Sequence, residues 1–334
     1  MGRYVARRIL WLFVVIFFVS LITFLIAHAV PGGPFSREKK LPPAVLKQLN
    51  AKYNLDDPLW LQYVNYMGGI FIPRIVVGEP STSLLEDHLI NIPLGNYTFQ
   101  WMNFGPSYKS QSRTVNDVFR ENFPVSVELG FYAFLIATVI GVPLGVVAAL
   151  KQNTAIDYLA MAVAIFGVSV PVIVLGPILI WLFAIQTPVF LPSGWGALRA
   201  QVLPSIALGL GSSAILARLT RASLLQVIRE DYIRTARAKG LAERVVVISH
   251  ALRNSLIPVV TVMGPIFALL VTGTFVTETI FGVPGMGRYF VTSITNRDYP
   301  VIMGTILLLA VIIVVANLVV DLMYAWLDPR IRYD

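Results

Sequence analysis

The sequence contains no cysteine, and this absence excludes disulfide bonds, thiolate metal sites and cysteine nucleophiles. Histidine is scarce too, because only His28, His88 and His250 occur and they lie in separate segments. None of them forms the His-x-x-x-His or His-Glu-x-x-His spacing of a zinc site. We therefore expect neither a metal site nor a catalytic residue in this chain.

A phosphate-binding loop of the form Gly-x-x-x-x-Gly-Lys-Ser/Thr is also missing. We accordingly expect this chain to bind no cofactor of its own. If ATP drives its activity, the ATPase must be a different chain.

Charged residues make up only 13% of the sequence and hydrophobic residues 56%. The mean hydropathy of +0.73 is too high for a water-soluble domain. This composition predicts an all-α integral membrane protein. The formal net charge is +8, but the basic residues concentrate beside apolar runs. Retention of basic residues on the cytoplasmic side of a membrane explains these positions better than nucleic-acid binding does. We do not expect the chain to bind nucleic acid.

Six apolar runs approach or exceed the roughly twenty residues that cross a bilayer. They are 9–30, 125–150, 157–186, 202–219, 258–280 and 300–327. The first run is too long for a signal peptide and follows the basic residues Arg3, Arg7 and Arg8. Basic residues concentrate in every second connection, at Lys151, from Arg218 to Arg253, and at Arg330 and Arg332. This asymmetry predicts six transmembrane helices with both termini in the cytoplasm.

Residues 31–124 are polar, aromatic and rich in turn-forming residues. We predict that they form a sizeable extracytoplasmic subdomain between the first and second spans. Helices are expected over Pro43–Tyr53 and from Pro58 to about Met67. The predicted organisation is thus a tail and first span (1–30), this subdomain (31–124) and a five-helix core (125–334).

Small residues occur inside three of the core spans. They are Gly141, Gly145, Ser169, Pro171, Gly209, Ser212 and Ser213. Such residues could line a weakly selective pathway, or they could only let helices approach closely, and both readings stay open. We expect the third span to be one helix despite Pro171, because neighbouring helices can satisfy the carbonyl group that a proline leaves free.

A polar segment, Glu230–Gly240, interrupts the apolar second half of the chain. Asp231 is a good N-cap, and Gly240 stands where a left-handed residue ends a helix. We predict a short helix over Tyr232–Lys239 and a second one over Ala242–Asn254, with Pro258 in the first turn of the next span. Small side chains lie among long cationic ones here, so a partner could approach the backbone closely. The coupling loop as a whole covers about 229–257.

The pattern Thr235-Ala-Arg-Ala-Lys-Gly240, followed by Leu256-Ile-Pro258, resembles the loop by which permease subunits of ABC importers hold their ATPases. In detail it resembles the peptide-importer branch, where Arg234-Thr235-Ala236 takes the place of Glu-Ala-Ala. That replacement leaves no acidic residue at this point. The resemblance implies that the ATPase-coupling residues are Tyr232, Ile233, Arg234, Thr235, Ala236, Arg237, Ala238, Lys239, Gly240 and Pro258.

Further segments extend the resemblance over nearly the whole chain. In the first half they are Pro31–Phe35, Lys52–Asp56, Gly105–Tyr108 and Val115–Val118. In the second half they are Glu278–Gly287, Asn296–Pro300 and the terminal Asp321 to Arg330. Residues 68–104 are expected to be longer than the same region of other family members.

The resemblance implies a transmembrane subunit of an ATP-driven oligopeptide or dipeptide importer in the bacterial cytoplasmic membrane. It also implies a second homologous permease subunit, two ATPase subunits that bind ATP and Mg, and an extracytoplasmic substrate-binding protein. The exact cargo stays open between oligopeptides, dipeptides, nickel chelates and others. An ion-coupled transporter is the alternative, but Glu128, Glu278 and Asp321 lie near the ends of spans and the span interiors are almost uncharged. An intramembrane enzyme is less favoured still, because no histidine lies near mid-membrane as a base.

Overall fold

The computed structural model describes residues 2–30, 32–35, 42–78, 83–110 and 112–327. The chain forms two compact units. The core unit comprises Met1–Trp11, Val125–Gly285 and Val311–Asp334. The second unit comprises Leu12–Pro124 and Met286–Ala310. The expected cytoplasmic end at Asp328–Arg332 and the turn at Pro31 lie outside the described residues.

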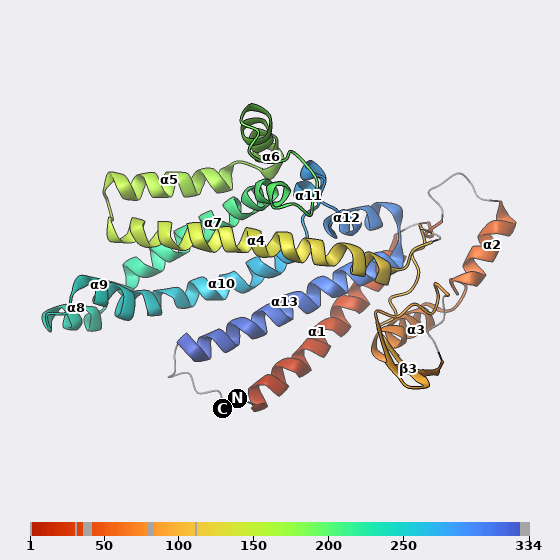
Figure 1. Ribbon diagram of the computed structural model, residues 1–334. Helices are drawn as coiled ribbons and strands as arrows, with labels where there is room; N and C mark the ends of the chain where they lie inside the picture. The colour runs from red at the N-terminus through yellow and green to blue at the C-terminus, as the bar shows by residue number, and fades with distance from the viewer. Residues whose placement is uncertain (1, 31, 36–41, 79–82, 111, 328–334) are drawn as a thin grey trace. The chain divides into compact units, whose positions relative to one another are not determined.

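Long helices form most of the core unit, and Figure 1 traces them along the chain. Three helices contribute residues to both units: α1 (Gly2–Ala29), α4 (Val115–Leu150) and α13 (Tyr299–Leu327). The others in the core unit are α5 (Ala155–Ser169), α6 (Val172–Ile180), η1 (Trp181–Gln186), α7 (Leu198–Val227), α8 (Asp231–Ala238), α9 (Glu243–Val245), η2 (Val246–Leu252), α10 (Arg253–Val271) and α11 (Phe275–Phe281). Helix α7 is the most enclosed of the long ones, and Leu203 and Leu216 on it are fully buried.

Five helical segments of the described chain are long and apolar enough to cross a membrane. They are Leu10–Ala29, Val115–Leu150, Leu198–Val227, Glu243–Val271 and Tyr299–Met323. The pair α5 and α6–η1 would be a sixth if it is counted as one broken span. All six predicted apolar runs are therefore helical, although two of them are not continuous.

The predicted third span is the first of these two, and the expectation of one unbroken helix is wrong. The chain bends by 103° between Ala155–Ser169 and Val172–Gln186. Val170 is extended, with φ −90° and ψ 111°, and Pro171 then begins the next helix. The residue before a proline is pushed away from helical geometry, and proline has no N–H to continue the ladder. Helix α6 still contains Pro177, so the break belongs to Pro171 and not to proline in general.

The predicted fifth span, 258–280, is also interrupted. Helix α10 ends at Val271, and α11 begins separately at Phe275. Between them Gly273 has a φ of +92°, which a residue without a Cβ adopts at little cost. The run is predominantly apolar on both sides of this turn, and mean hydropathy therefore gave no sign of it.

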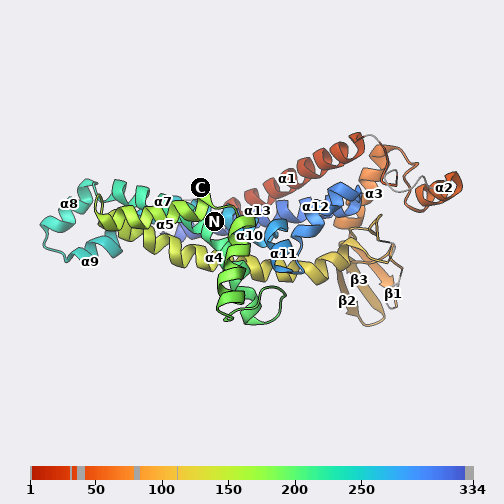
Figure 2. The same cartoon turned by 90° about the horizontal axis from the view of Figure 1, so that it is seen from above.

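The second unit contains the helices α2 (Pro43–Lys52), α3 (Leu59–Phe71) and α12 (Gly287–Asn296). Helices α2 and α3 agree with the predicted positions. A three-stranded antiparallel sheet of order β1-β3-β2 follows α3 and is seen in Figure 2. Its strands are β1 (Arg74–Val77), β2 (Ile90–Leu94) and β3 (Tyr97–Trp101). These strands were not predicted, so the fold is mainly helical and not all-α.

Candidate coupling surface and helix contacts

Helix α8 lies in the predicted coupling loop, shifted by one residue from the expected range. It covers Asp231–Ala238 with Glu230, and not Asp231, at the N-cap. Gly240 has a φ of +76°, which confirms the predicted left-handed position. The N–H of Gly240 donates to the carbonyl of Arg237 (2.9 Å), and that of Leu241 to the carbonyl of Ala236 (3.4 Å). This pair of bonds is the Schellman pattern that ends a helix.

Two side chains of α8 attach it to the core unit. Ile233 is fully buried and Ala236 is 7% exposed, three residues apart on one face. Both belong to one cluster of buried side chains with Ala149, Leu224 and Val246. The methyl group of Ala236 thus faces the core of its own chain. A contact between Ala236 and a partner stays a prediction.

Seven of the other predicted coupling residues lie on α8 or directly after it. Tyr232, Arg234, Thr235, Arg237, Ala238, Lys239 and Gly240 are exposed. The Arg237 guanidinium makes a bidentate pair with Glu243, with N–O distances of 2.6 and 3.1 Å. Asn254 donates to the Tyr232 hydroxyl at 2.8 Å. These polar contacts join α8 to the helix that follows it and leave Thr235, Ala238 and Lys239 accessible.

Pro258 does not open a new helix as predicted. The chain is helical from Glu243 through Val271, and Pro258 lies inside α10. The segment Val246–Leu252, which ends six residues before Pro258, is a π-helix with wider turns. Such turns commonly accompany a kink in a helix. The sequence contained no signal for the π-helix, because no residue type is required for it.

Three of the predicted small residues bring α4 and α7 into backbone contact. A Cβ atom added to Gly141 would lie 2.4 Å from the carbonyl oxygen of Ser213. A Cβ atom on Gly145 would lie 2.5 Å from the carbonyl oxygen of Ala217, and one on Gly209 would lie 2.6 Å from the carbonyl oxygen of Ala133. Ser213 is 5% exposed and donates to the carbonyl of Leu210 (2.7 Å) within its own helix. For these four residues the geometry favours the packing reading over the pathway reading.

The other predicted residues lie elsewhere. Ser169 and Pro171 are exposed at the break between α5 and α6, and Ser212 is half-buried on α7. The seven candidates are thus not assembled into one site within this chain. A pathway role for the exposed ones stays a prediction.

Two acidic side chains of the core unit, Asp157 and Glu128, are hydrogen-bonded to side chains that are distant in sequence. Asp157 is 1% exposed, and the Nε and Nη2 atoms of Arg221 donate to its two carboxylate oxygens, each at 2.7 Å. Glu128 accepts hydrogen bonds from Gln201 (3.0 Å) and from the Trp195 indole (3.2 Å). We did not predict the pair of Asp157 and Arg221, because the two residues are 64 positions apart. These contacts join α4, α5 and α7. They do not form a chain of ionisable groups that could pass a proton from one to the next.

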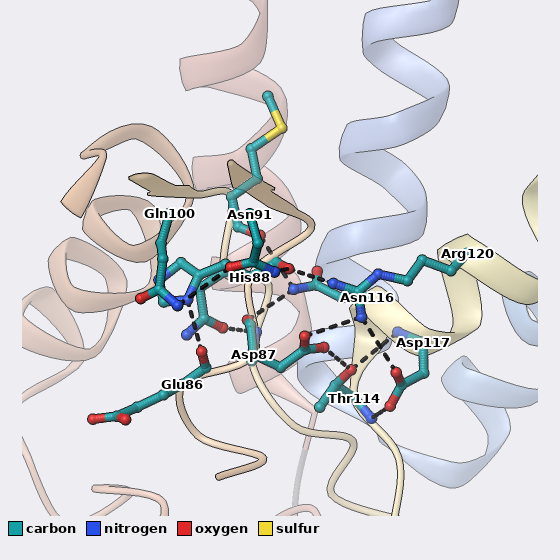
Figure 3. Close-up of polar contacts among 12 residues, drawn as sticks. Glu86, Asp87, His88, Asn91, Gln100, Thr114, Asn116, Asp117 and Arg120 are labelled. Atoms are coloured by element: carbon teal, nitrogen blue, oxygen red, sulfur yellow. Dashed lines mark hydrogen bonds and ion pairs between the residues drawn. The ribbon is translucent and has the colours of Figure 1, made fainter. Parts of the chain in front are cut away.

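Figure 3 shows a polar cluster in the second unit, where a loop meets the start of α4. Thr114 and Asp117 form a capping box, with N–O distances of 2.9 and 3.0 Å. Asp87 accepts from the Thr114 hydroxyl (2.5 Å) and from Arg120 (3.0 Å), and the Asn116 amide donates to the Asp87 carbonyl (2.8 Å). These hydrogen bonds attach the loop before β2 to the start of α4, although the side-chain oxygen of Asn116 is buried without a hydrogen-bond partner.

Two of the family-like segments meet in the second unit, although they are far apart in sequence. The Ser107 hydroxyl donates to the Asp298 carboxylate, and the Tyr108 N–H donates to it at 3.0 Å. Burial raises the pKa of Asp298 above its ordinary value, and these hydrogen bonds oppose that rise. A cavity of about 180 Å³ lies beside this contact. Aromatic side chains line much of it: Phe24, His28, Tyr53, Tyr66, Phe104, Tyr108 and Tyr299.

Two family models match the chain. The model described as the binding-protein-dependent transport system inner membrane component matches residues 141–333. The model of the N-terminal part of such components matches residues 1–86. Among solved structures, an inward-facing MetNI methionine ABC transporter covers 63% of this chain and 96% of its own, with a TM-score of 0.51 and 18% identity. At that identity the likeness concerns the fold alone.

Curated relatives match the chain end to end. The dipeptide transport system permease protein DppB of Bacillus subtilis is 43% identical over 332 residues, which cover 99% of this chain and 98% of the relative. The oligopeptide transport system permease protein OppB of Salmonella typhimurium is 40% identical over 335 residues, with all of both chains covered. The expectation that residues 68–104 are longer than the same region of other family members stays a prediction.

Proposed function

Because the chain belongs to the family of inner membrane components of binding-protein-dependent transport systems, we propose that it forms one membrane half of an ATP-driven peptide importer. Relatives named for dipeptide and for oligopeptide transport match it over its full length. The cargo is accordingly a short peptide, and the chain is a permease component of the cytoplasmic membrane. Hydrolysis of ATP takes place in two partner ATPase subunits, which hold the nucleotide and Mg.

The observation that carries the coupling role is the two-sided character of α8. Its inner side is fixed to the core unit by Ile233 and Ala236, and its outer side presents Thr235, Ala238 and Lys239. A helix held in this way can transmit a displacement from a partner to the spans behind it. We place the ATPase on this outer side.

The proposed topology follows from the basic residues and from α8. With α5 and α6–η1 as one broken span, the chain crosses the membrane six times and both termini are cytoplasmic. Residues 31–124 then lie outside, where the substrate-binding protein delivers peptide, and a second homologous permease completes the pathway. The sheet of the second unit is the part that we assign to contact with the binding protein.

Bulk on the outer side of α8 tests the coupling role. Ala238→Trp should reduce co-purification of the ATPase and substrate-stimulated hydrolysis, because a large side chain prevents close approach at an exposed position. Ala197→Trp, at an exposed alanine in the loop before α7, is the matched control and should leave both unchanged. Normal ATPase binding and normal peptide uptake by the Ala238→Trp variant would contradict the proposal that the ATPase contacts the outer side of α8.

A further inference from the structure

Helix α3 carries an apolar stripe that is largely exposed, and only Phe71 at its end has a ring contact within the described part of the second unit, with Phe13 of α1 at 6.4 Å. Trp60 is 67% exposed, Val64 is 55% exposed and Phe71 is 37% exposed. Together with the half-buried Met67, they are spaced by four, three and four residues and therefore lie on one face of the helix. No residue of α3 is charged.

The side of α3 next to the stripe is already occupied. The Tyr63 hydroxyl lies 2.8 Å from that of Ser20, and its ring lies 5.4 Å from the ring of Phe24, both of which are on α1. The Gln62 amide donates to the carbonyl groups of Leu55 and Asp57. Helix α3 is thus uncharged, with an apolar free stripe and with the polar groups of Gln62 and Tyr63 bonded on its packed side. An apolar stripe of this kind is normally covered by protein or by a membrane.

The position of α3 along α1 decides between these two environments. Tyr63 contacts Phe17, Ser20 and Phe24, which lie within the apolar segment Leu10–Ala29. At 1.5 Å per residue, Phe17 lies about 10 Å from one end of that segment and Phe24 about 8 Å from the other. The contact is therefore in the middle of a helix that is long enough to cross the roughly 30 Å of hydrocarbon. Helix α1 itself exposes Phe18 and Ile22, at 54% and 53%, in the same unit.

We propose that the stripe of Trp60, Val64, Met67 and Phe71 lies against the acyl chains of the bilayer, so that α3 is a membrane-embedded helix beside α1. With 13 residues it is too short to span. Its backbone groups bond within the helix, as the hydrocarbon region requires. The aqueous part of residues 31–124 then excludes α3, which changes the predicted boundary of the extracytoplasmic subdomain.

The proposal can be tested by spin labelling, because the chain has no cysteine of its own. The full chain carrying Val64→Cys is labelled and reconstituted into phosphatidylethanolamine–phosphatidylglycerol vesicles. Collisions of the label with oxygen, which enters lipid, and with a water-soluble nickel chelate are then measured. Ile22→Cys on the outward side of α1 is the lipid-facing control, and Ala51→Cys on α2 is the water-facing control; both positions are exposed.

The expected result is a high oxygen and a low nickel collision rate at position 64, as at position 22 and opposite to position 51. A nickel rate at position 64 equal to that at position 51 would place α3 in water and overturn the proposal. Low rates with both reagents would also overturn it, because the stripe would then be covered by protein. No peptide uptake is measured, and the result therefore does not depend on the proposed cargo.

Discussion

At the scale of single residues, Gly240 determines how α8 ends. Its φ of +76° strains any residue with a Cβ, whereas no atom lies within 4 Å of the position that a Cβ would take. Gly240→Val should therefore cost about 1–3 kcal/mol through backbone strain alone. We expect weaker ATPase co-purification with normal membrane insertion. Gly240→Asn is the control, because asparagine tolerates the left-handed region, and an equal loss in both variants would contradict this explanation.

Gly141 is a second residue whose lack of a side chain matters. Here the reason is the close contact between α4 and α7 and not a positive φ angle. A methyl group would lie 2.4 Å from the Ser213 carbonyl oxygen, so Gly141→Ala must push α4 and α7 apart. Overpacking of this kind costs about 1–3 kcal/mol. Thermal unfolding in detergent should show a lower midpoint for Gly141→Ala. Gly211→Ala, where the nearest atom is 3.8 Å away, should unfold at or above the wild-type temperature.

At the scale of elements, α8 depends on a small buried contact with the core unit. Ala236→Trp would place an indole among Leu224, Val246 and Ala251, where the cluster has no space for it. We expect α8 to detach, so that its backbone amides exchange with deuterium faster. Ala238→Trp on the outer side should leave amide exchange unchanged while both variants lose ATPase binding. Equal protection of α8 in the two variants would show that Ala236 is not an anchor.

The proline residues show that an element cannot be judged from residue type alone. Pro171 ends one helix and begins another, whereas Pro204, Pro258 and Pro265 lie inside continuous helices. The local restriction by proline is the same each time. The outcome differs because surrounding helices hold α7 and α10 in place, while the bend after α5 brings α6 against α7 and α11.

At the scale of the whole molecule, the proposed topology gives a labelling pattern. Ser83, Ser193 and Ser249 are all exposed, so reactivity at these positions reports the side of the membrane and not burial. Single cysteines at positions 83 and 193 should react with a membrane-impermeant thiol reagent in intact cells, and one at 249 should react only after lysis. Labelling of position 249 in sealed cells would contradict the six-span arrangement.

The sequence by itself determined the properties that depend on near neighbours. Apolar runs located the five helical segments that are long and apolar enough to cross a membrane and the bent pair α5 and α6–η1, because transfer to hydrocarbon depends on composition over about twenty residues. The cap at Gly240 and helices α2 and α3 could be predicted because they also depend on residues that are close in sequence. The hairpin of β2 and β3 could have been predicted too, since Gly95-Asn96 separates two apolar strands and is a common two-residue turn.

Only the tertiary structure decided which side chains meet. The inward direction of Ala236, the close contacts at Gly141 and Gly209, and the pair of Asp157 and Arg221 all involve residues distant in sequence. Helix α3 is a further example, because the environment proposed for its apolar stripe follows from the position of α3 beside the middle of α1. A local sequence pattern limits the secondary structure that a segment can adopt. The contacts of that segment depend on how the helices pack, and packing is a property of the whole chain.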